Sequence, residues 1–176
     1  MIITEDFARR TIEEVAPHIE ELSGLKVNLG GLVILMSDSK ENAASYSEIT
    51  NVIEVSESIL DKYNKDSFKE ALSHELTHLG QYSNFKDLSW RDYFARTTSS
   101  MPNEQNPVTS LIEGDATLIM RTFRNRYNPT NQEKICPKDY FAWSEILRKR
   151  FNGKRKDINE LYTAPIKELN KIFGIN

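Results

Sequence analysis

The chain has little of what marks a secreted, nucleic-acid-binding or membrane protein. It has one cysteine, so no internal disulfide can form, which suits a reducing compartment. Its 23 Lys and Arg against 26 Asp and Glu give a net charge of −3, so nucleic acid and anionic lipid are not expected partners. The longest apolar run, LVILM at residues 32–36, is far too short to cross a bilayer. The acidic amino terminus does not resemble a signal peptide. We therefore expect a cytoplasmic protein.

The hydrophobic pattern predicts an α+β protein, with one helix, a small sheet and then helices only. With 176 residues, one domain is expected. Residues 4–23 are predicted to form a helix that Pro17 kinks or splits. Residues 25–36 and 51–56 have strand patterns. A polar stretch from Ser37 to Ser47 lies between them and leads into the second.

Two long helices are predicted in the middle of the chain. The first is expected to start with a capping box of Ser67 and Glu70 and to end at Gly80. The second is expected to start at Asn106, with Pro107 in its first turn. Two or three amphipathic helices follow. Each long helix carries an apolar stripe that should be buried, formed by Phe68, Leu72, Leu76 and Leu79 in the first and by Val108, Leu111, Ile112, Ile119, Met120 and Phe123 in the second.

The first long helix contains HELTH at residues 74–78, with two of the chain's three histidines. Helix positions i and i+4 share a face, so both imidazoles can reach one Zn²⁺ at roughly 2.0–2.1 Å. Glu75 lies about 100° round the helix from His74, where its carboxylate can take a proton from metal-bound water without becoming a ligand. The pattern predicts His74 and His78 as zinc ligands and Glu75 as general base. A polar patch on an ordinary helix is the alternative, because the motif is short.

A third ligand is predicted on the second long helix, in TSLIEGDATLIM at residues 109–120. Glu113 shares a helix face with Ala116 and Met120, so its carboxylate points toward a buried stripe. A bound cation would remove the cost of placing a charge there. Gly114 costs about 1 kcal/mol relative to Ala inside a helix, and close approach of the histidine helix would offset this. The alternative is a solvated Glu113 beside an incidental glycine.

With these residues the sequence resembles the gluzincins, zinc peptidases with HExxH on one helix and a glutamate ligand on a later one. HELTH followed by EGDAT is similar to a group of prokaryotic metallopeptidase-like proteins with HELTHALQDQ and then EGDA. The EGxA portion is also similar to the glutamate-ligand helix of aminopeptidase-N-like enzymes. The resemblance implies a zincin-like fold and a peptidase reaction. It implies His74, His78 and Glu113 as Zn²⁺ ligands and Glu75 as general base and acid.

The resemblance is specific over residues 67–120 and departs from the family pattern within them. Residues 79–83, LGQYS, keep only Gln81 of the group's ALQDQ. Thr117 stands where thermolysin-like proteins have an aspartate. Asp115 is then either a carboxylate that orients a ligand histidine or a cap or surface residue.

Substrate contacts are predicted at two further places. In zincins an edge strand above the metal pairs with an extended substrate, and residues 51–56, NVIEVS, are the candidate. An ordinary strand is the alternative. A tetrahedral oxyanion needs a hydrogen-bond donor beyond zinc. Tyr162, in the turn-like segment ELYTAP, is the candidate donor.

The sequence thus predicts one gluzincin-type, zincin-like α+β domain over residues 1–176. Residues 1–65 would form a helix and a small mixed sheet, residues 66–127 the metal-site helices and residues 128–176 the C-terminal helices. The predicted function is Zn²⁺-dependent hydrolysis of a peptide or protein substrate, with neither nucleic acid nor membrane as partner. Two alternatives remain: a non-enzymatic zinc-binding zincin module, and a regulatory protease specific for one cytoplasmic partner. Intact Glu75 and three rather than four protein ligands favour an enzyme.

Overall fold

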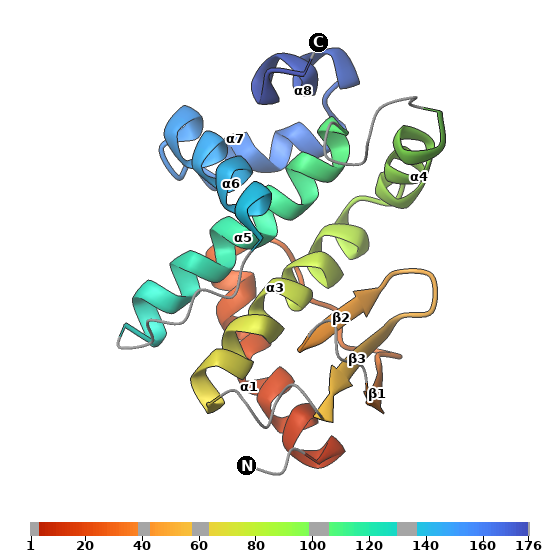
Figure 1. Ribbon diagram of the computed structural model, residues 1–176, viewed down its shortest axis with the longest axis vertical. Coiled ribbons are helices and arrows are strands. Elements are labelled where there is room, and N and C mark those ends of the chain that lie inside the picture. Colours follow the sequence, from red (N-terminus) through yellow and green to blue (C-terminus); the bar gives the residue numbers. More distant parts are fainter. Residues whose placement is uncertain (1–3, 39–42, 58–63, 99–105, 130–136, 176) are drawn as a thin grey trace. The chain divides into compact units, whose positions relative to one another are not determined.

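The computed structural model describes residues 4–38, 43–57, 64–98, 106–129 and 137–175, with the backbone alone for 94–98. Within these ranges the chain forms seven α-helices and one three-stranded sheet (Figure 1). This confirms the mainly helical α+β class; the zincin-like fold stays a prediction. The backbone divides into two compact units. The single-domain organisation also stays a prediction. Unit 1 comprises Met1–Ser83 and Ile119–Ile135, and unit 2 comprises Asn84–Leu118 and Cys136–Asn176.

The first helix of unit 1, α1 (Glu5–Ser23), begins and ends through local capping contacts. The Oγ1 atom of Thr4 accepts the N–H of Phe7 at 3.2 Å, which satisfies one of the helix's first donors. Gly24 ends the helix in the left-handed conformation, with φ 70°. Pro17 lies inside α1. The predicted alternative in which Pro17 splits the helix is therefore wrong.

The second helix of unit 1, α3 (Lys65–Asn84), begins earlier than the sequence pattern predicts. The Oδ1 atom of Asn64 accepts the N–H of Ser67 at 2.8 Å and therefore caps the helix. The predicted capping box is wrong, because Glu70 pairs elsewhere. Its buried carboxylate accepts the guanidinium of Arg124, on the unit 1 part of α5, at 2.7 Å. This buried ion pair links the two helices one turn before His74.

The predicted end of α3 at Gly80 is also wrong, because the helix continues to Asn84. Gly80 is buried, and the preceding loop packs directly over it. A Cβ atom at Gly80 would lie 3.4 Å from the Cβ of Leu25 and 3.7 Å from the Cγ2 of Val27. The glycine therefore marks a contact between α3 and this loop rather than a helix terminus.

The sheet of unit 1 has the strand order β1–β3–β2, with β1 (Val33–Ser37), β2 (Ala44–Ser47) and β3 (Val52–Ser56). β3 pairs in parallel with β1 and antiparallel with β2. The strand predicted at residues 51–56 is present, but its predicted edge position is wrong, since both of its sides are paired. β2 lies within the polar stretch where no strand was predicted. It is the edge strand nearest α3 in Figure 1.

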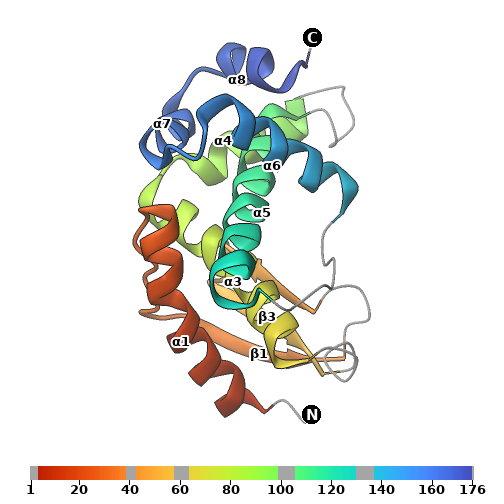
Figure 2. The ribbon, with the colours of Figure 1, turned by 90° about the vertical axis from the view of Figure 1, so that its left-hand side faces the viewer.

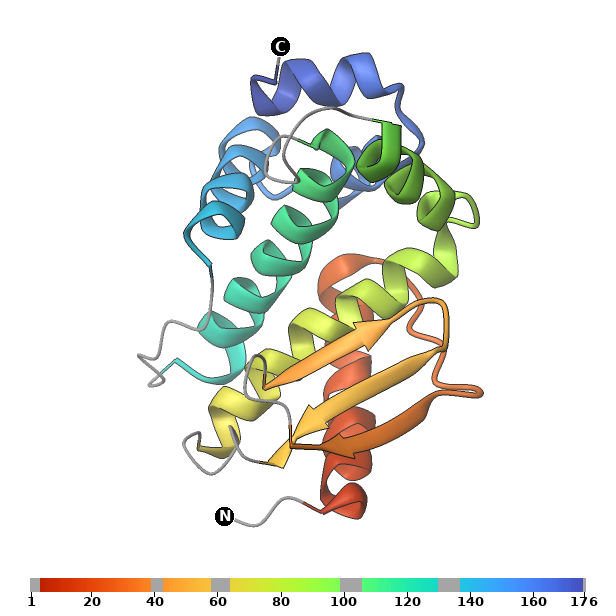
Figure 3. The ribbon, with the colours of Figure 1, turned by 45° about the vertical axis from the view of Figure 1, so that its right-hand side comes forward.

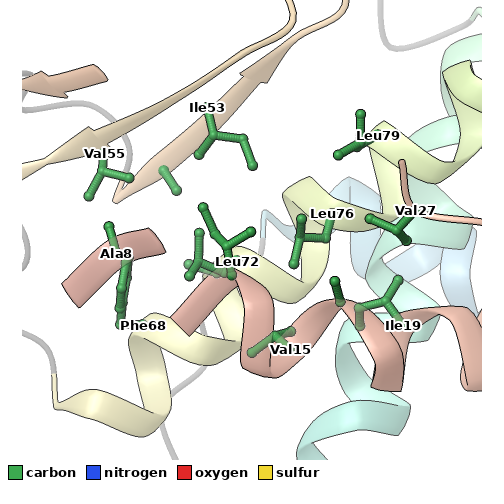
Figure 4. Close-up of a cluster of buried hydrophobic side chains, with 14 of the residues drawn as sticks. Ala8, Val15, Ile19, Val27, Ile53, Val55, Phe68, Leu72, Leu76 and Leu79 are labelled. Atoms are coloured by element: carbon green, nitrogen blue, oxygen red, sulfur yellow. The ribbon is translucent and has the colours of Figure 1, made fainter. Parts of the chain in front are cut away.

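The core of unit 1 fills the space between the sheet and two helices. α1 and α3 lie on the same face of the sheet (Figure 3), and their apolar side chains point toward Ile53 and Val55 (Figure 4). The other face leaves Val33 and Leu35 about half exposed, at 52% and 53%. The predicted stripe of α3 is confirmed, because all of its members are buried: Phe68, Leu72, Leu76 and Leu79.

Unit 2 is helical in its described residues. The first part of α5 (Pro107–Tyr127) runs beside α6 (Figure 2). As predicted, Asn106 caps α5, and its Oδ1 accepts the N–H of Val108 at 2.9 Å. No helix in the described ranges is long and apolar enough to span a bilayer. The other elements of the unit are α4 (Leu88–Thr98), α6 (Lys138–Phe151), α7 (Arg155–Glu160), the 3₁₀ turn η2 (Leu161–Thr163) and α8 (Ile166–Phe173).

Candidate metal centre

The two histidines of the HELTH motif project their ring nitrogens toward one point. They lie one turn apart on α3, away from its apolar stripe. Their Nε2 atoms are 3.0 Å apart, and the rings stand nearly perpendicular, at 87°. Two nitrogens bound to one Zn²⁺ at roughly 2.0–2.1 Å in tetrahedral geometry lie about 3.3–3.4 Å apart. The observed separation is close to this value, so His74 and His78 fit as ligands of one ion.

Glu113 of α5 supplies the third candidate donor. One ligand atom from each of His74, His78 and Glu113 lies within 4.8 Å of the others. His78 is buried, and the other two residues are half-buried. Two imidazoles and one carboxylate form a donor set suited to zinc, so these residues form a candidate metal site.

Gln81 contacts the ring of His78, the buried member of the three candidate ligands. The Nδ1 atom of His78 lies 2.8 Å from the Oε1 atom of Gln81, which is fully buried. Because a carbonyl oxygen only accepts hydrogen bonds, Nδ1 carries the proton and the lone pair of Nε2 remains for a metal. Such contacts fix the tautomer and orientation of ligand histidines. Gln81 was noted in the sequence only for its match to the family, although its i+3 spacing from His78 places it on the same helix face.

Glu75, the predicted general base, is held by the edge of the sheet. Its Oε2 atom accepts the backbone N–H of Tyr46, on β2, at 2.8 Å. The carboxylate therefore lies between the metal-site helix and the edge strand. Sequence reasoning missed Tyr46, because no pattern in the polar stretch links it to a helix 29 residues away.

Gly114 provides room for α6 rather than for the histidine helix. A Cβ atom there would lie 2.8 Å from the Cβ of Trp143 and 3.1 Å from its backbone carbon. The first separation is shorter than Cβ atoms in real structures show, and the second is tighter than most such contacts. The predicted close approach at Gly114 is therefore confirmed, but its predicted partner is wrong.

Asp115 forms a buried ion pair and is neither a cap nor a surface residue. Its carboxylate is fully buried and accepts the guanidinium of Arg155, with one contact at 2.9 Å. Its Oδ2 atom also accepts the hydroxyl of Tyr162 at 2.6 Å. Burial lowers the pKa of Arg155, but the charge and hydrogen bonds of Asp115 outweigh this and raise it above its ordinary value. Asp115 thus holds α7 and η2 against α5, and its contacts among the described residues are with Arg155 and Tyr162.

The candidate oxyanion donor, Tyr162, is buried in this network. It is 1% exposed, and its ring stacks on Phe85 with the centroids 4.5 Å apart. An oxyanion donor must offer its hydroxyl hydrogen to the substrate, whereas this hydroxyl donates to Asp115. The catalytic role of Tyr162 stays a prediction, and it requires that hydrogen bond to break.

A cavity of about 460 Å³ lies in unit 2 beside Tyr162. Arg91, from α4, spans part of it and donates to the backbone carbonyls of Tyr162 and Ala164, the second at 2.6 Å. Burial lowers the pKa of Arg91 below its ordinary value. The guanidinium joins α4 to the chain before α8, and the residues that line this cavity do not include the candidate metal ligands.

Comparison with known proteins finds no matching family, no matching curated protein and no matching solved structure.

Proposed function

We propose that this protein is a zinc-dependent peptidase of gluzincin type. The observation that carries the proposal is the convergence of His74, His78 and Glu113. A structural zinc site normally takes four protein ligands, whereas a catalytic site takes three and keeps one position open. Three donors together with an adjacent Glu75 match the catalytic arrangement.

A zinc ion bound by these residues would supply Lewis-acid activation, lowering the pKa of a water molecule to about 7. The chain's own residues would do the rest. Glu75 follows the first ligand directly and lies off the ligand face, so its carboxylate can accept a proton and later donate it to the leaving amine. Gln81 keeps His78 in the tautomer that binds the metal.

The substrate is proposed to be a polypeptide in extended conformation. Among the described strands β2 lies at the edge of the sheet, and the backbone groups of Ala44 and Tyr46 on the side away from β3 can pair with another strand. Glu75 contacts this same edge. The substrate-binding strand assigned at residues 51–56 is thus replaced by β2.

Zinc content and cleavage of a broad peptide mixture test this function together. The full chain loaded with zinc should hold one equivalent and cut peptides from a proteome digest, with new termini detected by mass spectrometry. Glu75→Gln should keep the zinc and lose cleavage by about a hundredfold to ten-thousandfold. Zinc binding without cleavage by the wild-type protein would refute the peptidase and leave a metal-binding module.

A further inference from the structure

On the side away from β3, where no described strand pairs with it, β2 has two backbone N–H groups. The carbonyl of Ala43 accepts the N–H of Ser56, on the β3 side, at 3.0 Å. Residues of an antiparallel edge strand alternate between facing the partner strand and facing away. The backbone N–H and C=O groups of Ser45 and Ser47 therefore point toward β3, whereas those of Ala44 and Tyr46 point away from β3. Of these two outward N–H groups, that of Tyr46 donates to Glu75.

The side chain of Tyr46 holds this N–H in place. Its hydroxyl donates to the Oδ1 atom of Asn51 at 3.3 Å, and its ring lies 6.4 Å, centroid to centroid, from the ring of Tyr82 on α3. Asn51 adopts a left-handed conformation, with φ 52°, in the turn that joins β2 to β3. The N–H of Tyr46 is therefore positioned by the hairpin and by α3, the helix that also carries Glu75.

Two acceptors can use the N–H of Tyr46: the carboxylate of Glu75 and a strand that pairs with β2. A polypeptide that adds to β2 as a further strand would pair with the outward N–H and C=O groups of Ala44 and Tyr46. Glu75 uses one of these donors already. We propose that Glu75 and an extended polypeptide compete for the Tyr46 N–H, so that docking on β2 breaks the hydrogen bond between Tyr46 and Glu75. We call this competition the latch, and it rests on the proposed function.

The competition favours long extended segments over very short ones. The bond from Tyr46 to a carboxylate is charge-assisted and about twice as strong as the neutral amide–carbonyl bond that replaces it. A ligand that forms only this one bond therefore does not displace Glu75. A segment that also pairs with Ala44 and with the Tyr46 carbonyl gains further bonds that offset the exchange. The expected substrate class is thus a polypeptide strand and not a free dipeptide.

Amide hydrogen exchange on the zinc-loaded full chain tests the latch without any cleavage. In Glu75→Ala the amide of Tyr46 should exchange about ten- to hundredfold faster than in the wild-type protein. The amide of Ala44, which faces the same way, is the internal control and should not change. Equal exchange at Tyr46 in both proteins would overturn the contact on which the latch depends.

Binding of uncleavable peptides tests the competition. The probes are fluorescein-labelled, proline-free octapeptides with a reduced central peptide bond, and the tightest binder to Glu75→Ala is used throughout. It should bind Glu75→Ala about tenfold or more tightly than the wild-type protein, because the N–H is no longer occupied. Failure of every octapeptide to bind Glu75→Ala would overturn the proposal.

A pair of proline variants separates the latch from a general effect of the Glu75 charge. An edge strand tolerates proline where the N–H faces outward. In Tyr46→Pro the gain from Glu75→Ala should vanish, whereas in Ala44→Pro and in Tyr46→Ala it should remain. A gain that persists in Tyr46→Pro would refute the latch. A protein that shows the latch but cuts no peptide would refute the peptidase alone, and cleavage without the latch would refute the latch alone.

Discussion

Glu113 and Asp115, two residues apart on α5, are expected to respond to substitution in opposite ways. Glu113→Ala removes one of three candidate ligands from a half-buried position, so zinc affinity should fall while the metal-free fold is nearly unchanged. Asp115→Ala removes the buried carboxylate that faces Arg155 and accepts from Tyr162. Loss of one partner of a buried ion pair costs roughly 3–5 kcal/mol. The fold should therefore be weakened and the zinc site largely kept.

The size of the two effects follows from linkage. Zinc at a thousand times its dissociation constant raises the free energy of unfolding of the wild-type protein by about 4.1 kcal/mol. If loss of Glu113 weakens binding a hundredfold, the same zinc concentration raises it by only about 1.4 kcal/mol. Asp115→Ala should lower the metal-free value by about 3 kcal/mol, the lower end of the range, because the side chain of Arg155 is 21% exposed.

Urea denaturation in EDTA and again in excess zinc measures both quantities on each variant. Glu113→Gln and Asp115→Asn are the matched controls, since they keep the side-chain shape and remove the charge. The two alanine variants should therefore differ. Glu113→Ala should lose most of the zinc-dependent stabilisation, whereas Asp115→Ala should lose stability without zinc. If Asp115→Ala lost the zinc-dependent stabilisation and Glu113→Ala kept it, both the ligand assignment and the gluzincin type would be refuted.

Four further outcomes are expected. Gln81→Leu should weaken zinc binding about ten- to hundredfold in a chelator titration, and unchanged affinity would show that the amide does not orient the ligand ring. Gly114→Ala should lower the free energy of unfolding by about 1–3 kcal/mol, because its Cβ would meet Trp143 at 2.8 Å. Gly80→Ala, with its nearest atom at 3.4 Å, should be neutral or stabilising by up to about 1 kcal/mol, and equal destabilisation by both would contradict this packing. Burial raises the pKa of the Tyr46 phenol, so the unfolded chain loses that proton first. Stability should hold below about pH 10 and fall above it, and this fall should be smaller in Tyr46→Phe, as measured by urea denaturation across that range.

The helices were predictable because their signals are local. The stripe of α3 and the Asn106–Pro107 start of α5 each depend on residues within a few turns, and both were confirmed. The errors at the ends of α3 share a physical cause. Asn64 is as good an N-cap residue as Ser67. A glycine against which a neighbouring loop packs looks the same in the sequence as a glycine that ends a helix. Sequence spacing does not distinguish these uses.

The sheet was harder to predict because pairing is not local. Four residues of β2, Ala-Ser-Tyr-Ser, carry no strong alternation of apolar and polar side chains. The alternation in β3 reports a strand but not how many of its sides are paired. An apolar strand at 51–56 could therefore be assigned, whereas its central position depends on β1 and β2 together.

The sequence pointed to the three candidate donors of the metal centre, but not to the residues that contact them. HELTH fixes the relation of His74, Glu75 and His78 within one helix, so their shared geometry follows from helix periodicity. The contact of Gln81 with His78 could have been predicted in the same way, from its i+3 spacing. The contact of Asp115 with Arg155 joins residues 40 apart, and no spacing rule reports a buried ion pair of that kind.

The strand order of the sheet also has a consequence for the path of folding. The pairs that join β2 to β3 are separated by 5 residues (Ser47 with Val52) to 11 (Ala44 with Val55). Each pair of β1 with β3 is separated by 19, as Val33 with Val52. Contacts close in sequence form with less loss of chain entropy and therefore sooner. The β2–β3 hairpin is expected to form before β1 is added to its far side, so the strand edge that meets Glu75 belongs to the early part of the sheet.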